Sequence, residues 1–242
     1  MKQQGLLLGR TALITGASVG IGRAIAFALA EEGAALMLCG RNEEALDSLN
    51  LEILDRGGKS VHYVCDITTN EGLEELTRFT ELNYPVLDIL VHNAGVGSFD
   101  LHNELSDEDW DFQMNTNARA IFQLTRSLEP MLWRSSSPLI IGILSDASIR
   151  YFSHGSLYSA SKAAAHAYLA SLRKEWQGSG MRVTSIYPGV VATAFDGNAA
   201  DAPYKEDWLQ AEDVASAVRY VCTQPDHVLV DEIVIHPISQ TY

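Results

Sequence analysis

Basic residues are scarce in this sequence. Its 242 residues include 17 lysines and arginines against 31 aspartates and glutamates, which gives a formal net charge of −14. A surface with this balance repels the phosphates of nucleic acids and the anionic head groups of lipids. We therefore expect neither a nucleic acid nor a membrane among the partners of this protein.

Long apolar runs and cysteines are also few. No uninterrupted apolar stretch approaches the roughly 20 residues of a membrane-spanning helix, and the short apolar patch before Gly9 lacks the end of a cleavable signal peptide. The three cysteines, Cys39, Cys65 and Cys222, stand singly in apolar surroundings without metal-ligand spacing. Their odd number disfavours a disulfide framework. These absences predict a soluble protein of the reducing cytoplasm.

What the sequence does contain is a regular alternation of short apolar blocks with longer amphipathic segments. This pattern is typical of strands joined by crossover helices, and continuous apolar blocks indicate strands that are buried on both faces. Strands are predicted near Thr11–Thr15, Ala34–Cys39, Ser60–Cys65, Leu87–His92, Leu139–Leu144, Arg182–Tyr187 and Leu229–His236. Helices are predicted over Ile21–Glu32, Glu43–Asp55, Asn70–Leu82, Asp107–Trp133, Leu157–Gln177 and Ala211–Cys222. The predicted fold is α/β, doubly wound and Rossmann-type, with a seven-stranded, mostly parallel sheet and helices on both faces.

This element count leaves no chain for a second domain, so we expect residues 1–242 to form one domain. Residues 193–210 depart from the regular pattern, because glycine, proline and acidic residues replace the periodic apolar positions. Irregular segments of this length in a compact domain are often functional loops. We expect this segment to be a substrate loop.

A glycine-rich segment, TGASVGIG, joins the first predicted strand to the first predicted helix. Gly16, Gly20 and Gly22 would permit a tight turn, a close backbone approach to a ligand and close helix packing, and the helix N-terminus would offer free N–H groups to a pyrophosphate. The spacing is GxxxGxG rather than GxGxxG, and a turn needed only for packing is the alternative. The strand-to-helix context favours a dinucleotide site.

The end of the second predicted strand indicates which dinucleotide is bound. A carboxylate at this place would bind the ribose hydroxyls of NAD(H), whereas an arginine suits the 2′-phosphate of NADP(H). The chain has Gly40 and Arg41 here, so NADP(H) is favoured over NAD(H), although a merely solvated arginine is the alternative. After the third strand, Asp66 would accept a hydrogen bond from the adenine amino group or serve as a turn or capping residue.

Tyr158 and Lys162 lie four residues apart in LYSASKAAAH, on one face of a predicted helix. Ser145 follows the apolar strand LIIGIL and so reaches the sheet edge that the HNAG segment and the glycine loop share. Asn117 lies inside a long predicted helix. Asparagine is a mediocre helix former, so its presence there indicates another role. The small residues around Tyr158 and Lys162 would let their helix lie close to a cofactor.

Taken in order, TGASVGIG, HNAG, Asn117, Ser145, YSASK and YPGVVAT resemble the motifs of the short-chain dehydrogenase/reductase family in its compact form. The resemblance spans nearly the whole chain and implies a single dinucleotide-binding catalytic domain that assembles as a homodimer or homotetramer. It implies a catalytic tetrad of Asn117, Ser145, Tyr158 and Lys162. The implied cofactor-binding residues are Gly16, Ser18, Gly20, Ile21, Gly22, Arg41, Asn42, Asp66, Ile67, Asn93, Ala94, Gly95, Tyr158, Lys162, Pro188, Gly189, Val191 and Thr193, the last two at the carboxamide end of the nicotinamide. No metal site is expected, because no ligand pair has a chelating spacing.

The tetrad implies hydride transfer between the nicotinamide and a small-molecule carbonyl or alcohol substrate. Tyr158 would be the acid/base, with Lys162 and the positive ring of the oxidised cofactor lowering its pKa from the usual value of about 10. Ser145 would hydrogen-bond the substrate oxygen. By resemblance, Asn117 would fix a water that relays protons to Lys162.

Three departures from the common family pattern concern the substrate rather than the tetrad: His92, Leu144 and the ending DEIVIHPISQTY. This ending looks more like that of the NADP-dependent carbonyl and hydroxy-acid reductases of the family. Candidate substrate-pocket residues are Phe99, Asp146, Tyr151, His154, Phe195 and Trp208.

Two other functions are compatible with the fold. One is a catalytically silent, dinucleotide-sensing binding protein. The other is a sugar-nucleotide epimerase or dehydratase, which uses a similar tyrosine and lysine pair but normally needs a larger C-terminal region than the chain has after Pro188.

Overall fold

In a computed structural model that describes residues 5–241, seven strands form one sheet in the order β3-β2-β1-β4-β5-β6-β7. Every neighbouring pair of strands is parallel. The strands are β1 (Thr11–Thr15), β2 (Ala35–Gly40), β3 (Lys59–Val64), β4 (Ile89–His92), β5 (Leu139–Ile143), β6 (Arg182–Pro188) and β7 (Glu232–Ile235). The doubly wound α/β fold is therefore confirmed, with a sheet that is wholly rather than mostly parallel.

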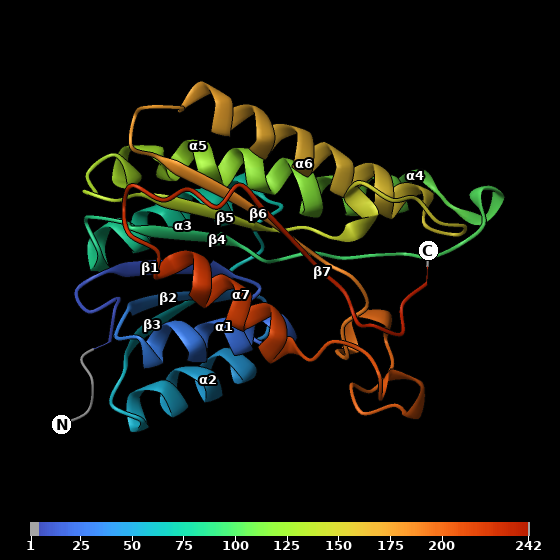
Figure 1. Ribbon diagram of the computed structural model, residues 1–242, viewed down its shortest axis with the longest axis horizontal. Helices are drawn as coiled ribbons and strands as arrows, with labels where there is room; N and C mark the ends of the chain where they lie inside the picture. The colour runs from blue at the N-terminus through green and yellow to red at the C-terminus, as the bar shows by residue number, and fades with distance from the viewer. Residues whose placement is uncertain (1–4, 242) are drawn as a thin grey trace.

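The helices form a layer on each face of the sheet (Figure 1). One layer contains α1 (Gly20–Glu31), α2 (Glu43–Asp55) and α7 (Ala211–Cys222), and the other contains α3 (Asn70–Asn83), α4 (Asp107–Met114), α5 (Ala120–Leu132) and α6 (Ser156–Glu175). Two buried clusters separate these layers from the sheet, and neighbouring strand residues alternate between them: Ile14 packs in the first and Leu13 in the second. This alternation explains why strands such as β2 and β5 are nearly continuous apolar blocks.

The helix predicted over Asp107–Trp133 is interrupted, which corrects the sequence interpretation. It begins as predicted, with the Ser106 hydroxyl accepting a hydrogen bond from the N–H of Asp109, but a π-helical turn, Asn115–Arg119, separates α4 from α5. A π-turn adds one residue to a helical turn and so shifts the direction of the side chains. Apolar periodicity does not reveal a shift of one residue.

The strand β7 is shorter than the predicted Leu229–His236. Before it, the side chains of Arg182 and Thr184 bind the carbonyl oxygens of Val228 and Val230, so these residues are held by side chains rather than by a strand ladder. After it, the chain reaches Pro237, which has no N–H to donate.

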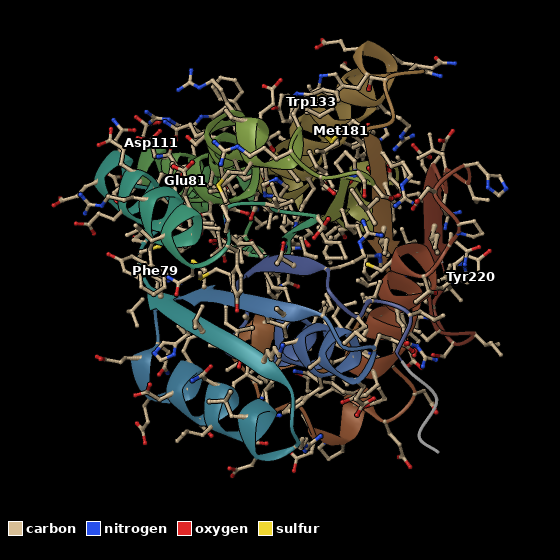
Figure 2. The ribbon with its side chains drawn as sticks, turned by 90° about the vertical axis from the view of Figure 1, so that its left-hand side faces the viewer. Phe79, Glu81, Asp111, Trp133, Met181 and Tyr220 are labelled. Atoms are coloured by element: carbon tan, nitrogen blue, oxygen red, sulfur yellow. The ribbon has the colours of Figure 1, made fainter. Side chains whose placement is uncertain are left out.

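The carboxyl ends of the strands meet at one edge of the sheet, on the right of Figure 1, where the C-terminal segment and the loop of residues 193–210 also lie. Short 3-10 turns in the loops comprise His102–Glu104, Asp146–Ser148, Ala194–Asp196 and Pro203–Lys205. Figure 2 views the opposite end of the molecule, which carries Trp133 and Met181. Across residues 5–241, no helix combines the length and the apolar character that crossing a membrane requires.

Candidate active site

A cavity of about 1470 Å³ opens at the carboxyl edge of the sheet. All of the residues that the family resemblance assigns to the cofactor line this cavity, and Ser145 lines it as well. The predicted pocket residues Phe99, Asp146, Tyr151, Phe195 and Trp208 also line it, but His154 does not. Asn117 is fully buried behind the cavity wall rather than in it.

Close contacts explain why the glycine loop needs glycines. Gly16 has a φ of 64°, and a Cβ there would lie 2.9 Å from the Cα of Ala94. A Cβ at Gly22 would lie 2.1 Å from the carbonyl oxygen of Gly16. The amide of Asn93 fixes this loop by donating to the carbonyl oxygens of Thr15 and Gly16 at 2.9 and 3.0 Å.

Thr15 is a site residue that the sequence interpretation missed. Its side chain is buried, and its hydroxyl oxygen accepts hydrogen bonds from the N–H groups of Asn93 and Ala94, both at 3.1 Å. The threonine thereby joins the end of β1 to the segment after β4. The sign of this role in the sequence was a hydroxyl residue directly after the apolar residues 12–14 of the strand.

The N-terminus of α1 follows the glycine loop, and its first residues line the cavity. Within the described chain, no side chain caps α1 at Val19, and its first turn carries no acidic residue. The next three helices are each capped by a side chain, from Asn42, Thr69 and Ser106. Uncapped N–H groups at a helix N-terminus bind phosphate groups well. The glycine cradle and this open N-terminus together fit the pyrophosphate of a dinucleotide.

Arg41 and Asp66 follow neighbouring strands at one end of the cavity. The side chain of Arg41 is exposed, whereas Asp66 accepts hydrogen bonds from the N–H and hydroxyl of Thr68 at 2.9 and 2.7 Å. Partial burial raises the pKa of Asp66, but the Thr68 hydrogen bonds and the charge of Arg41 outweigh this effect and lower it. Asp66 thus serves as a turn residue, and its contact with adenine stays a prediction. Asn42, assigned to the cofactor, also caps α2 by accepting from the N–H of Ala45 at 3.0 Å.

Two of the three cysteines, which stand singly in the sequence, come together in the fold. The Sγ atoms of Cys39 and Cys65 lie 3.5 Å apart, and both residues line the cavity beside Arg41 and Asp66. They are 26 positions apart in the chain, so only the pairing of β2 with β3 brings them together.

Tyr158 and Lys162 both extend from α6 toward the cavity. The Lys162 side chain is buried, its Nζ donates to the carbonyl oxygen of Ile143 at 3.2 Å, and the same atom lies 5.9 Å from the centre of the Tyr158 ring. Burial raises the pKa of Tyr158 to about 12, with the nearby Ser145 hydroxyl acting in the opposite direction, and burial lowers the pKa of Lys162 to about 8. In the protein by itself desolvation dominates and raises the pKa of this phenol. That Lys162 and the oxidised cofactor together lower it stays a prediction.

Asn117 performs a structural task in the π-turn. Its side-chain oxygen accepts from the N–H of Val96 at 2.9 Å, and its Nδ2 donates to the Val96 carbonyl oxygen and to the Ser161 hydroxyl at 2.8 and 2.9 Å. A Cβ at Gly95 would lie 3.2 Å from the Nζ of Lys162 and 3.3 Å from the side-chain oxygen of Asn117. Asn117 therefore holds the segment after β4 against Lys162, while the water relay stays a prediction.

His92 lies below the cavity, at the end of β4. It is buried, its Nε2 is 2.8 Å from the Thr125 hydroxyl, and burial lowers its pKa to about 3. The ring is therefore neutral near neutral pH. Within the described residues, no three histidine, cysteine, aspartate or glutamate side chains gather as a metal site would require.

The C-terminal segment supplies a second residue that the sequence interpretation missed. The Nε2 of Gln240 donates to the Asp146 carboxylate at 2.6 Å, and its Oε1 accepts from the N–H of Val190 at 3.0 Å. A Cβ at Gly189 would lie 2.1 Å from that Oε1. Gln240 thus ties the segments that follow β5 and β6, directly beside Ser145.

A buried lysine fixes the loop of residues 193–210. Lys205 is 1% exposed, and its Nζ donates to the Thr193 carbonyl oxygen and to the Asp196 carboxylate, both at 2.6 Å. The Tyr204 hydroxyl donates to the other Asp196 oxygen at 2.7 Å. The hydrogen bond from Lys205 is the main reason that the pKa of Asp196 lies well below its usual range. A lysine in a polar loop is normally exposed, so the sequence offered no sign of this contact.

Comparisons with known proteins bear on the family and the fold. The short chain dehydrogenase family matches residues 10–203. An uncharacterized oxidoreductase of Staphylococcus aureus (strain USA300) is 35% identical over 233 residues, which cover 96% of this chain and 99% of the relative. The structure of an alcohol dehydrogenase from the archaeon Thermococcus sibiricus, complexed with 5-hydroxy-NADP, has a TM-score of 0.91 at 31% identity and covers 96% of this chain and 98% of its own. The closed form of a serine dehydrogenase complexed with NADP+ has a TM-score of 0.87 at 29% identity over 96% of each chain.

Proposed function

Because the chain belongs to the short-chain dehydrogenase family, we propose that it is an NADP(H)-dependent oxidoreductase acting on a carbonyl or alcohol substrate. One observation carries this proposal: a single cavity is lined by the glycine loop, by Arg41 and by Ser145, Tyr158 and Lys162. The bound nicotinamide would supply the hydride for carbonyl reduction, or accept it in the reverse reaction.

In carbonyl reduction, the substrate oxygen gains negative charge and needs a proton. The high pKa of Tyr158 keeps its phenol protonated near neutral pH, which is the form that donates. The Lys162 ammonium would stabilise the phenolate that remains. The Ser145 hydroxyl would donate to the substrate oxygen as its charge develops, and a well-placed donor of this kind contributes about 3–4 kcal/mol.

Aromatic side chains surround the proposed acid. The rings of Phe99 and Phe195 lie 5.2 and 5.9 Å from the Tyr158 ring, centre to centre, and Phe152 lies 6.1 Å from Phe99. Apolar walls favour apolar substituents on a ligand. We therefore expect ketones and aldehydes with an apolar group to be better substrates than fully polar ones.

Replacement of Tyr158 by phenylalanine tests the mechanism. The variant should bind NADPH as the wild type does, yet lose about 10²- to 10⁴-fold in kcat, because the proton donor is removed. NADPH absorbance with a panel of ketones, aldehydes and hydroxy acids measures turnover, and titration calorimetry measures binding. Tyr220→Phe is the matched control, since this tyrosine of α7 is exposed and lies outside the cavity.

Two results would contradict the proposal. Turnover retained by Tyr158→Phe would remove this residue from the mechanism. A wild-type protein that binds NADPH but oxidises it with no member of the panel would favour the catalytically silent binding protein instead.

Replacement of Arg41 by aspartate tests the cofactor preference. The variant should lose about ten- to a hundredfold in the ratio of kcat/KM for NADPH over NADH, because a hydrogen bond to a charged group contributes about 1.5–3 kcal/mol. Several similar structures were solved with NADP or with 5-hydroxy-NADP, which supports the same cofactor here. Lys59→Asp is the control, since Lys59 begins β3 at the opposite edge of the sheet. An unchanged ratio in Arg41→Asp would contradict binding of the 2′-phosphate by Arg41.

A further inference from the structure

The two cysteines beside Arg41 and Asp66 contact each other through their sulfur atoms. Cys39 lies in β2 and Cys65 directly follows β3, where its N–H donates to the carbonyl oxygen of Gly40 at 3.0 Å. The two Sγ atoms are 3.5 Å apart. The reaction proposed above uses neither thiol, and both residues line the cavity.

We propose that Cys39 and Cys65 form a redox-sensitive dithiol, which a peroxide converts into a disulfide at the cofactor end of the cavity. The formation of this bond goes beyond the proposed reaction and does not depend on it. Only its consequence for cofactor affinity depends on the proposed cofactor site.

The two sulfur atoms differ in accessibility, which assigns their roles. Cys65 is partly exposed, whereas Cys39 is fully buried beneath it. The hydrogen bond from the Cys39 thiol lowers the pKa of Cys65, and the same bond, together with burial, raises the pKa of Cys39. Since the thiolate is the reactive form of cysteine, Cys65 is the residue that a peroxide meets first.

The chemistry proceeds in two balanced steps. The Cys65 thiolate attacks the peroxide, so that an S–O bond forms, the O–O bond breaks, and the released hydroxide becomes water by taking up a proton. The Cys39 sulfur then attacks the sulfur of the Cys65 sulfenic acid: the S–S bond forms, the S–O bond breaks, and the hydroxyl leaves as water with the Cys39 proton. The two thiols are oxidised by two electrons, and the peroxide is reduced to two waters.

Formation of the bond should disturb the proposed cofactor site. A disulfide has an S–S distance of about 2.05 Å, so the sulfur atoms must approach from 3.5 Å and draw the ends of β2 and β3 together. Arg41 follows Cys39 by two positions, and Asp66 follows Cys65 directly. The displacement would therefore move the groups expected to hold the 2′-phosphate and the adenine.

Peptide mapping of the cofactor-free protein tests the bond itself. After treatment with hydrogen peroxide, blocking of the remaining thiols and digestion with trypsin without reductant, residues 24–41 and 60–78 should appear as one cross-linked species. Cys222→Ser is the matched control and should give the same cross-link, because Cys222 lies in α7 and packs in the cluster on the other face of the sheet. Cys39→Ser should stop at a Cys65 sulfenic acid that dimedone traps, and Cys65→Ser should leave Cys39 reduced.

Several outcomes would overturn the proposal. These are three unreacted thiols, a Cys65 sulfinic acid without the cross-link, or a cross-link that includes Cys222. None of these readouts uses turnover. The disulfide can therefore be tested even if the protein fails every carbonyl assay.

The effect on the cofactor is measured separately, by calorimetry with NADPH. The oxidised wild type should bind NADPH at least about tenfold more weakly than the reduced protein, with recovery after dithiothreitol, and saturating NADP+ should slow formation of the cross-link. Equal affinities of the oxidised and reduced forms would contradict the coupling between the dithiol and the cofactor site.

Discussion

Burial sets the protonation of individual residues around the cavity. It raises the pKa of Tyr158 to about 12 and lowers that of Lys162 to about 8, and both shifts favour the uncharged side chain. As the pH rises, the protein alone therefore loses the proton of Lys162 before that of Tyr158. This order leaves the tyrosine as a proton donor over the whole neutral range.

The buried side chain of His92 makes the stability of the protein depend on pH. Its pKa falls from 6.5 to about 3 in the folded protein, so between these values the unfolded chain binds a proton that the folded chain does not. The stability that this residue contributes is complete above pH 6.5 and is lost as the pH falls toward 3. From pH 6.5 to about pH 5 the expected loss is about 2 kcal/mol in the free energy of unfolding.

Urea unfolding of His92→Asn at both pH values checks this expectation. Asparagine keeps a polar group near Thr125 but does not titrate, so the variant should lack this part of the pH dependence. His227→Asn, at an exposed histidine, should retain it. An identical loss of stability in His92→Asn and the wild type would rule out His92 as the source.

Among the structural elements, α2 and α7 have the predicted bounds, Glu43–Asp55 and Ala211–Cys222. Asn42 is a capping residue that precedes two acids, a clear start signal for α2. The interruption at Asn115–Arg119 was not predicted, because a π-turn depends on what the buried Asn117 amide contacts in Val96 and Ser161.

The C-terminal segment supports a prediction about the active site. Gln240→Ala removes both hydrogen bonds that tie Asp146 to Val190, so Ser145 loses its neighbouring support. We expect about a tenfold loss in kcat/KM for the carbonyl substrate, as for one or two hydrogen bonds of about 1 kcal/mol each. Steady-state kinetics with NADPH at saturation measures this effect.

Two further variants separate the role of Gln240 from a general effect of the tail. Gln240→Glu keeps the acceptor for Val190 but places a carboxylate against Asp146, so its activity should improve as the pH falls and one carboxylate takes up a proton. Ser239→Ala removes only an exposed hydrogen bond to Asp207 and should behave as the wild type. Equal activity of Gln240→Ala and Ser239→Ala would show that the tether does not position Ser145.

For the whole molecule, exposed aromatic side chains mark the outer surface of α4 and α5. Trp110, Phe112, Phe122 and Trp133 are 42–46% exposed, and Phe122 packs edge-on against Tyr168 of α6 at 5.8 Å. Figure 2 shows Trp133 at one end of this surface. Exposed apolar patches of this kind often form subunit interfaces. We propose that the protein is a homodimer or homotetramer with two-fold symmetry across these helices.

Sedimentation velocity at micromolar concentration tests this assembly. The wild type should sediment as a dimer or tetramer, and Phe122→Glu should shift it toward the monomer, because a charge would be buried in the interface. Leu82→Glu, at an exposed position at the end of α3, should not change the assembly. A wild-type monomer would contradict the proposal.

The fold and the family could be predicted from the amino-acid order, and both predictions are confirmed. Apolar blocks, capping residues and motifs are local or depend on chain order, so they can be read along the chain. Other contacts exist only because folding brings side chains together, and the order of residues gives no sign of them: Gln240 with Asp146, Lys205 with Asp196, and Cys39 with Cys65. The raised pKa of Tyr158 in the protein by itself has the same origin, because desolvation depends on everything packed around a group and not only on its neighbour one helical turn away.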